Sequence, residues 1–222
     1  MRHVVFTPDR NKISNDYVGA FEPEALRYAS YWAGQGDEVT IHKMPPMSAE
    51  RSVLKMLEVI EAACNVDRLV FFCHGWKTGI QMGLSCGDDK GRDTLATFCT
   101  RLVTASTPQL KVTLYACSTG ASSTSVTGDG GFADALRDGL CKAGRADVTV
   151  FAHTTAGHTS RNEYVRFFSG KGDPLGGVGG DDVVARKTPE FAKLRERLHE
   201  VKDDLRWRLP YLGADEIHKE LA

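Results

Sequence analysis

Several features that mark special classes of protein are missing from this sequence. It contains no run of about 18 apolar residues, which excludes a transmembrane helix. Its formal net charge is -1, so the charge balance gives no reason to expect nucleic acid or an anionic membrane as a partner. The first residues lack a long apolar stretch and a small-residue cleavage site, so we expect no secretory signal.

Cysteine pairs of the metal-binding or redox type are also missing. The six cysteines include no C-x-x-C pair, and we predict no metal site and no cofactor. Without a secretory signal, reduced thiols in the cytosol are the expectation, so the predicted location is cytoplasmic. Most of these thiols are expected to be small buried hydrophobes.

The sequence does contain an alternation of strand and helix patterns. Patterns typical of strands lie at residues 3–6, 38–42, 68–73, 111–116, 147–152 and 163–168, and helical patterns at 22–34, 48–64, 93–104 and 132–143. In the second helix, Leu54, Leu57 and Ile60 are spaced for one apolar face. Such alternation indicates a parallel sheet with helices on both faces. The predicted fold is therefore an α/β three-layer sandwich with a mostly parallel sheet of about six strands, plus a helical C-terminal tail.

The chain divides into three predicted parts. Residues 1–168 form the α/β domain, residues 169–187 a glycine-rich loop, and residues 188–222 a helical tail. A phosphate-binding glycine loop lies between an early strand and a helix, whereas this one follows the last strand, so it does not indicate a nucleotide. The tail has one apolar stripe. We expect this stripe to pack on its own domain, or else to dock on a regulatory protein or on a second copy of the chain. The stripe consists of Phe191, Leu194, Leu198, Val201 and Leu205.

Reactive residues follow two of the predicted buried strands. His74 ends the segment LVFFCHGW, and Cys117 ends the apolar part of VTLYACSTG. In an open parallel sheet, sites lie at the carboxyl ends of the strands. Neighbouring strands are about 4.8 Å apart, so the imidazole and the thiol can approach one another if these two strands are adjacent.

This pair has the chemistry of nucleophilic catalysis. A nearby histidine lowers the pKa of a thiol by stabilising the thiolate, and it can later protonate a leaving amine. The N–H groups of Gly75 and Cys117 are candidate donors for an oxyanion hole. Cys73 precedes His74 and, by strand alternation, points to the opposite face, so we expect it in the core. Cys64, Cys99 and Cys141 lie in helical patterns and are also expected in the core.

At these residues the sequence resembles the caspase-like cysteine peptidases, which include caspases, metacaspases, legumains, gingipains, separases and bacterial CHAT-type domains. Their pattern is an apolar strand ending in His-Gly, followed roughly forty to fifty residues later by a strand ending in Ala-Cys or Ser-Cys. Here these are His74-Gly75 and Ala116-Cys117. The resemblance implies a thiol protease, a hydrolase that cleaves protein or peptide substrates without a cofactor.

The resemblance extends less closely to residues 150–164, which are similar to the strand that forms one wall of the S1 pocket in legumains and caspases. It implies that substrate-binding residues lie here. They would be Thr154, Thr155, Ala156, His158, Ser160 and Arg161. Metacaspases have an acid where this chain has Tyr115, and legumains have one where it has Ser118, so a preference for Arg or Lys at P1 is not supported.

Two other functions fit the same residues. Ala116-Cys117-Ser118-Thr119-Gly120 fits a relaxed nucleophile elbow of an α/β-hydrolase-type serine esterase, with Ser118 as nucleophile and His153 or His158 as base. Against it, the elbow begins with alanine instead of glycine. A catalytically silent caspase-like interaction domain is the other alternative, against which the presence of both His74 and Cys117 argues.

Overall fold

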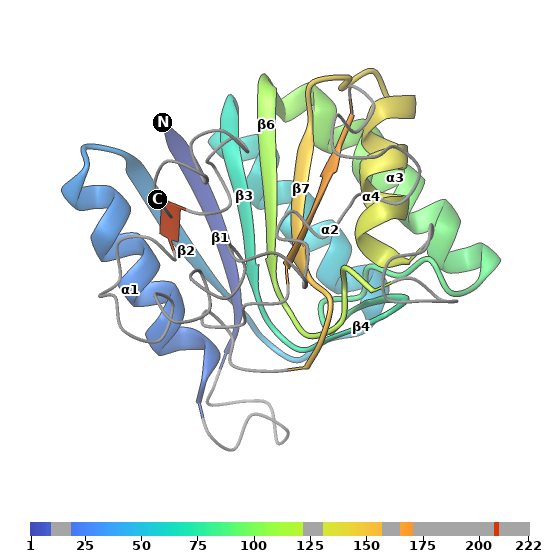
Figure 1. Cartoon of the computed structure of the whole chain (residues 1–222), viewed down its shortest axis with the longest axis horizontal. Coiled ribbons are helices and arrows are strands. Elements are labelled where there is room, and N and C mark those ends of the chain that lie inside the picture. The colour runs from blue at the N-terminus through green and yellow to red at the C-terminus, as the bar shows by residue number, and fades with distance from the viewer. Residues whose placement is uncertain (10–18, 122–130, 157–164, 171–206, 209–222) are drawn as a thin grey trace, which may run out of the picture.

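A six-stranded sheet forms the centre of the molecule. The computed structural model describes residues 1–9, 19–121, 131–156, 165–170 and 207–208. The strand order is β2-β1-β3-β6-β7-β8, with the first five strands parallel and β8 antiparallel to β7 (Figure 1). The strands are β1 (Arg2–Pro8), β2 (Glu38–Met44), β3 (Val66–Phe72), β6 (Ser106–Tyr115), β7 (Thr149–His153) and β8 (Val165–Ser169). The prediction of an α/β fold with a mostly parallel sheet is confirmed.

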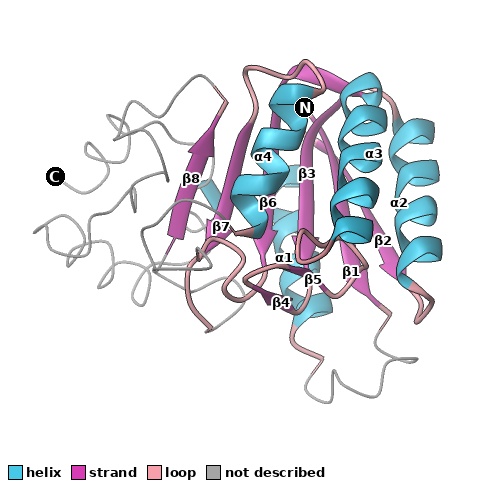
Figure 2. Cartoon of the chain, turned by 90° about the vertical axis from the view of Figure 1, so that its right-hand side faces the viewer, coloured by secondary structure: helices cyan, strands magenta, loops and turns pink. Residues whose placement is uncertain are grey.

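In the described part of the chain, four helices lie against this sheet. The first helix, α1 (Phe21–Gly34), lies on one face, and the other three lie side by side on the opposite face (Figures 1 and 2). These three are α2 (Ala49–Ala63), α3 (Asp89–Ala105) and α4 (Phe132–Lys142). No described helix has the length and apolar character that crossing a bilayer requires.

The apolar stripe of α2 differs from the predicted one. Val53, Met56, Leu57 and Ile60 are buried, whereas Leu54 is 53% exposed. An α-helix turns about 100° per residue, so Leu54 lies that far around the helix from Val53. The prediction of Leu54 on the apolar face was wrong. Three residues fall short of a full helical turn, so successive steps of three move around the helix and out of the buried face.

Two of the cysteines predicted to lie in the core are not fully buried. Cys64 is exposed, because it follows the last turn of α2 with a positive φ of 42°. Cys141 is half-buried. Cys73 and Cys99 are completely buried, as expected. None of the six cysteines, all of which lie in described segments, forms a disulfide.

The sheet face that carries α1 has an aromatic core. Tyr28 of α1 packs with Phe72 and Tyr115, whose rings stack with centroids 4.5 Å apart. Trp207 is fully buried and contacts all three rings. This residue of the predicted tail is therefore packed on the sheet. Apart from Ser169, Gly170, Trp207 and Arg208, the predicted loop 169–187 and tail 188–222 lie outside the described residues.

A short hairpin that we did not predict follows β3. Its strands are β4 (Gly75–Trp76) and β5 (Gly79–Ile80), which pair antiparallel. Figure 2 shows it below the ends of β3 and β6, at the carboxyl edge of the sheet. Strands of two residues are too short to show the alternation by which a strand is recognised in a sequence.

Candidate active site

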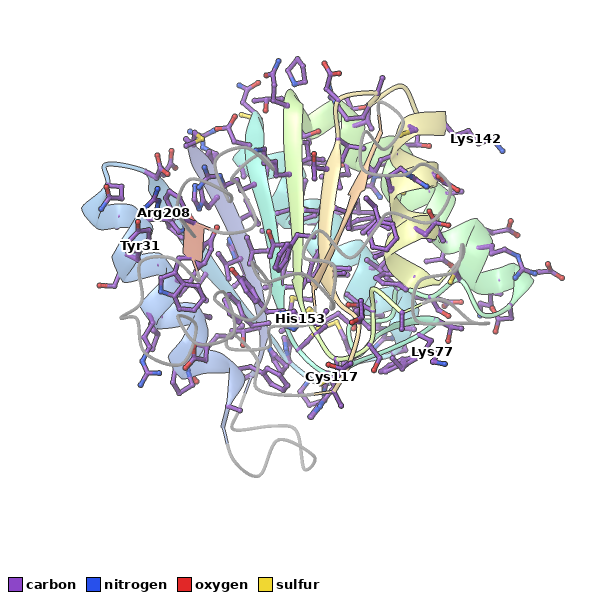
Figure 3. All side chains as sticks on the ribbon, viewed as in Figure 1. Tyr31, Lys77, Cys117, Lys142, His153 and Arg208 are labelled. Carbon is purple, nitrogen blue, oxygen red and sulfur yellow. The ribbon has the colours of Figure 1, made fainter. Side chains whose placement is uncertain are left out.

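The register of the sheet brings His74 and Cys117 level with one another. Strands β3 and β6 are parallel neighbours, and their last paired residues are Phe72 and Tyr115. Two residues further along each chain are His74 and Cys117. Because neighbouring strands lie about 4.8 Å apart, the two residues emerge side by side at the carboxyl edge of the sheet. Figure 3 shows Cys117 at this edge and His153 at the end of β7.

The alternation of β3 and β6, continued for two residues beyond their ends, would direct both side chains to the face that carries α1. Phe72 and Tyr115 stack on that face, and residues two positions further point the same way. The contact of His74 with Phe21, the first residue of α1, agrees with this: their rings meet edge to face with centroids 4.8 Å apart. His74 is exposed and Cys117 is half-buried, so a ligand can reach both.

Cys73 lies on the opposite face of the sheet, where burial changes the acidity of its thiol. It is completely buried in the core beneath the other helices. Burial raises the pKa of the Cys73 thiol far above its ordinary value, because the thiolate would lose its hydration. Cys73 therefore stays protonated and unreactive, although it adjoins His74 in the chain.

Glycine at position 75 allows the His74 loop to approach the Cys117 turn closely. A Cβ atom at Gly75 would lie 2.7 Å from Thr119 Cγ2 and 2.8 Å from both Ala116 Cβ and the Cys117 carbonyl oxygen. Carbon atoms in contact are normally about 3.5–4.0 Å apart. Any side chain at position 75 would therefore push apart the two loops that carry His74 and Cys117.

The turn after Cys117 is held by β7. The Ser118 N–H donates to the Thr155 carbonyl at 3.1 Å, and the Gly120 N–H donates to the His153 carbonyl at 2.7 Å. Ser118 has a φ of +57°, a conformation that costs a non-glycine residue about 1–3 kcal/mol. The chain therefore turns sharply directly after Cys117, two residues beyond the end of β6.

The start of α4 supports the same turn. The Ala133 N–H donates to the Thr119 carbonyl at 3.0 Å, and the Phe132 N–H donates to the Lys77 carbonyl of the hairpin at 2.8 Å. The loops after β3 and β6 are thus tied to one helix, which holds their relative position.

The predicted substrate-binding residues divide into two groups. Thr154, Thr155 and Ala156 follow β7 at the carboxyl edge, beside the Cys117 turn. Thr154 is buried, Thr155 is half-buried and Ala156 is exposed. The other three, His158, Ser160 and Arg161, lie outside the described residues.

Sequence reasoning missed Gln81, which holds the backbone of His74. The Gln81 side-chain oxygen accepts a hydrogen bond from the His74 N–H at 3.3 Å, and the Gln81 N–H donates to the His74 carbonyl at 3.0 Å. Phe21 was missed as well. Neither residue belongs to a motif, and only the folded chain brings them to His74.

The connections that follow β1 and β3 run to opposite faces of the sheet, and His74 lies where they diverge. β1 leads to α1 on one face of the sheet, whereas β3 leads through the hairpin to α3 on the other. The carboxyl ends of two such strands form a topological switch point, where open α/β sheets bind their ligands. His74 follows β3 at this position.

The described residues contain no group of three or more His, Cys, Asp or Glu side chains placed to hold a metal ion. Comparisons with protein-family models, with curated proteins and with solved structures found no match to this chain.

Proposed function

We propose that the chain is a cysteine endopeptidase of the caspase-like kind. One observation carries the proposal: the register of the parallel neighbours β3 and β6 ends at the pair Phe72 and Tyr115, and His74 and Cys117 each follow two residues later. Under this proposal the sheet with its helices is the caspase-like three-layer sandwich, and the ligand at its carboxyl edge is a protein or peptide.

The reaction would proceed through a thioester. His74 takes the proton of the Cys117 thiol, and the sulfur attacks the carbonyl carbon of the peptide bond. The leaving amine departs with the proton that His74 returns to it. Water, deprotonated by His74, then attacks the thioester, releasing the new carboxyl group and restoring the thiol.

The backbone of the site limits which groups can hold the oxyanion. The Ser118 N–H already donates to the Thr155 carbonyl, so it is engaged within the turn. The N–H groups of Gly75 and Cys117 are the donors that we assign to the oxyanion hole. Loss of one such donor typically costs about 3–4 kcal/mol of transition-state stabilisation.

Alkylation of two cysteines within one protein tests the dyad. Cys64 is exposed and precedes β3, at the opposite edge of the sheet from the site, so it serves as an internal control thiol. We expect iodoacetamide to label Cys117 at pH 7 about ten-fold faster in the native protein than in His74→Ala, because the imidazole takes the proton of the thiol as the sulfur reacts. Labelling of Cys64, followed by peptide mass spectrometry, should be equal in both proteins. Equal alkylation rates of Cys117 in the native protein and in His74→Ala would contradict a catalytic pair of His74 and Cys117.

A serine esterase remains the second candidate, and the backbone of Ser118 favours it. A nucleophile elbow holds its serine in a strained strand-to-helix turn, and Ser118 has such a φ. Its candidate base His153, however, is 2% exposed and packs against Tyr115 and Phe151.

Paired substitutions distinguish the two enzymes. As a peptidase the chain should lose hydrolysis in Cys117→Ala and keep it in Ser118→Ala, measured on a fluorogenic peptide library. The opposite result, with hydrolysis of p-nitrophenyl esters, would establish the serine enzyme. A native protein that cleaves neither substrate would favour the catalytically silent interaction domain.

A further inference from the structure

A second feature of the carboxyl edge is a small cavity where β1 and β2 end. Its volume is about 170 Å³. The walls come mainly from methionines and prolines: Met44, Met47, Met82, Pro8, Pro45 and Pro46. We call it the Met/Pro pocket. None of the residues that line it carries a charge, and Ser52 and Gln81 are its polar residues.

The Met/Pro pocket adjoins the candidate active site through Gln81. This residue lines the pocket, and it also makes two hydrogen bonds with the backbone of His74. The sheet register supports the same placement. Phe6 pairs with Phe71, so Pro8 lies level with Cys73, one residue before His74.

The distance from Cys117 to the pocket matches a few residues of an extended peptide. Cys117 follows β6, and the pocket lies at the ends of β1 and β2, two to three strands away in the sheet. At about 4.8 Å per strand the separation across the sheet is roughly 10–14 Å, which an extended chain covers in three or four residues at about 3.3 Å each. The peptide would cross the carboxyl edge of the sheet toward α2, whose Ser52 lines the pocket.

The size and lining of the pocket suit one apolar side chain. Sites that enclose a whole small molecule usually have about 300–1,000 Å³, which is more than this cavity offers. Methionine side chains are flexible and polarizable, so they adapt to unbranched, branched and aromatic groups alike. An ionised side chain would find no counter-charge among the lining residues and would lose its hydration.

We propose that the Met/Pro pocket is a substrate subsite that binds an apolar side chain, such as that of Leu, Met or Phe, three or four residues from the scissile bond. This inference rests on the proposed peptidase function and names a specificity determinant for it. Gln81 then has two roles, because it positions His74 and forms the wall of the pocket nearest to it.

Filling the pocket tests the inference. Met47 is half-buried and lies outside the main hydrophobic core, so Met47→Trp can occupy the cavity without disturbing the sheet. Leu54→Trp, on the exposed side of α2, is the matched control. The probe is a fluorogenic peptide library randomised at four positions on each side of the cleaved bond.

We expect the native protein to prefer Leu, Met or Phe over Asp at one position three or four residues from the cleavage site, by about ten-fold or more in kcat/KM. Met47→Trp should abolish this preference and leave the preference at P1 unchanged, and Leu54→Trp should behave like the native protein. The rate of Cys117 alkylation by iodoacetamide should be equal in all three proteins, which reports an intact dyad.

Two failures are distinguishable. If Met47→Trp cleaves the library with the native preference at every position, the pocket is not a subsite, although the peptidase proposal stands. If the native protein cleaves no peptide and Cys117 shows no dependence on His74, the peptidase proposal fails and the subsite with it.

Discussion

Substitution of Gly75 by alanine tests how closely the His74 and Cys117 loops must approach. The new Cβ would lie 2.7 Å from Thr119 Cγ2 and 2.8 Å from Ala116 Cβ. These distances are about 0.7–1.3 Å shorter than ordinary carbon contacts. The Cys117 carbonyl oxygen, also at 2.8 Å, belongs to the backbone and cannot rotate away as a flexible side chain could.

Both stability and activity should respond to Gly75→Ala. Overpacking of this kind costs about 1–3 kcal/mol, which corresponds to about 2–12 °C in Tm for a protein of this size, at roughly 2–4 °C per kcal/mol. The loops relieve the overlap by moving apart by nearly 1 Å, and a misplacement of about 1 Å can reduce a catalytic rate about 100-fold. We expect kcat on the best library peptide to fall by about that factor.

Gly34→Ala is the matched control, because no atom lies within 4 Å of a Cβ at that position. It should leave activity unchanged and should not lower Tm. The double variant Gly75→Ala, Thr119→Ser removes the nearest clashing atom and keeps the hydroxyl that donates to the Ala116 carbonyl, so it should recover part of the lost stability. Calorimetry and peptide hydrolysis measure both effects. A Gly75→Ala protein with native Tm and native kcat would refute the close approach.

Three further predictions concern other parts of the molecule. Gln81→Ala removes the side-chain acceptor of the His74 N–H, so we expect about 1 kcal/mol lower stability and a several-fold lower kcat; Gln81→Glu, which keeps the acceptor, should restore most of the activity if the hydrogen bond is the cause. Trp207→Ala should lower the free energy of unfolding in urea by about 3–5 kcal/mol, because this indole is fully buried among three aromatic rings. Trp76→Ala, at a residue 45% exposed, should change it by less than about 0.5 kcal/mol, and equal losses in the two variants would contradict the packing of Trp207. Burial lowers the pKa of His3 from 6.5 to about 4, so the unfolded chain binds a proton in this range and the folded chain does not. Stability should therefore fall by up to about 3 kcal/mol as the pH drops from 6.5 to 4, and His3→Gln should show a shallower decline; parallel curves would contradict a neutral buried His3.

The packing around His3 explains why the pKa of its imidazole is lowered. Its ring is completely buried, with Nδ1 2.9 Å from the Tyr28 hydroxyl and Nε2 3.1 Å from Asp37. Arg68 also faces this site, 3.8 Å from the same carboxylate. Burial and the Arg68 charge oppose protonation of His3, and they outweigh the attraction of Asp37.

The strands were predictable because each pattern is local. β3 and β6 contain apolar runs of the kind that a strand buried on both faces requires, and these end where Cys73-His74 and Ala116-Cys117 begin. β6, however, starts at Ser106 and not at Lys111. Its first residues follow α3 directly and pair irregularly with β3, so no apolar run marks them.

The reactive residue types that follow β3 and β6 could be recognised from the amino-acid sequence. Apolar runs that stop at His74 and at Cys117 place an imidazole and a thiol at the carboxyl edge of a parallel sheet, and alternation assigns Cys73 to the other face. That β3 and β6 are neighbours, in a register that makes the two residues level, became visible only in the folded chain. The folded chain also shows that Gln81 holds His74, that Phe21 contacts it and that Trp207 packs over the aromatic face. These contacts join residues that are distant in the chain or lie in irregular loops. The periodicity of a sequence predicts local helices and strands, and it does not predict which of their surfaces pack together.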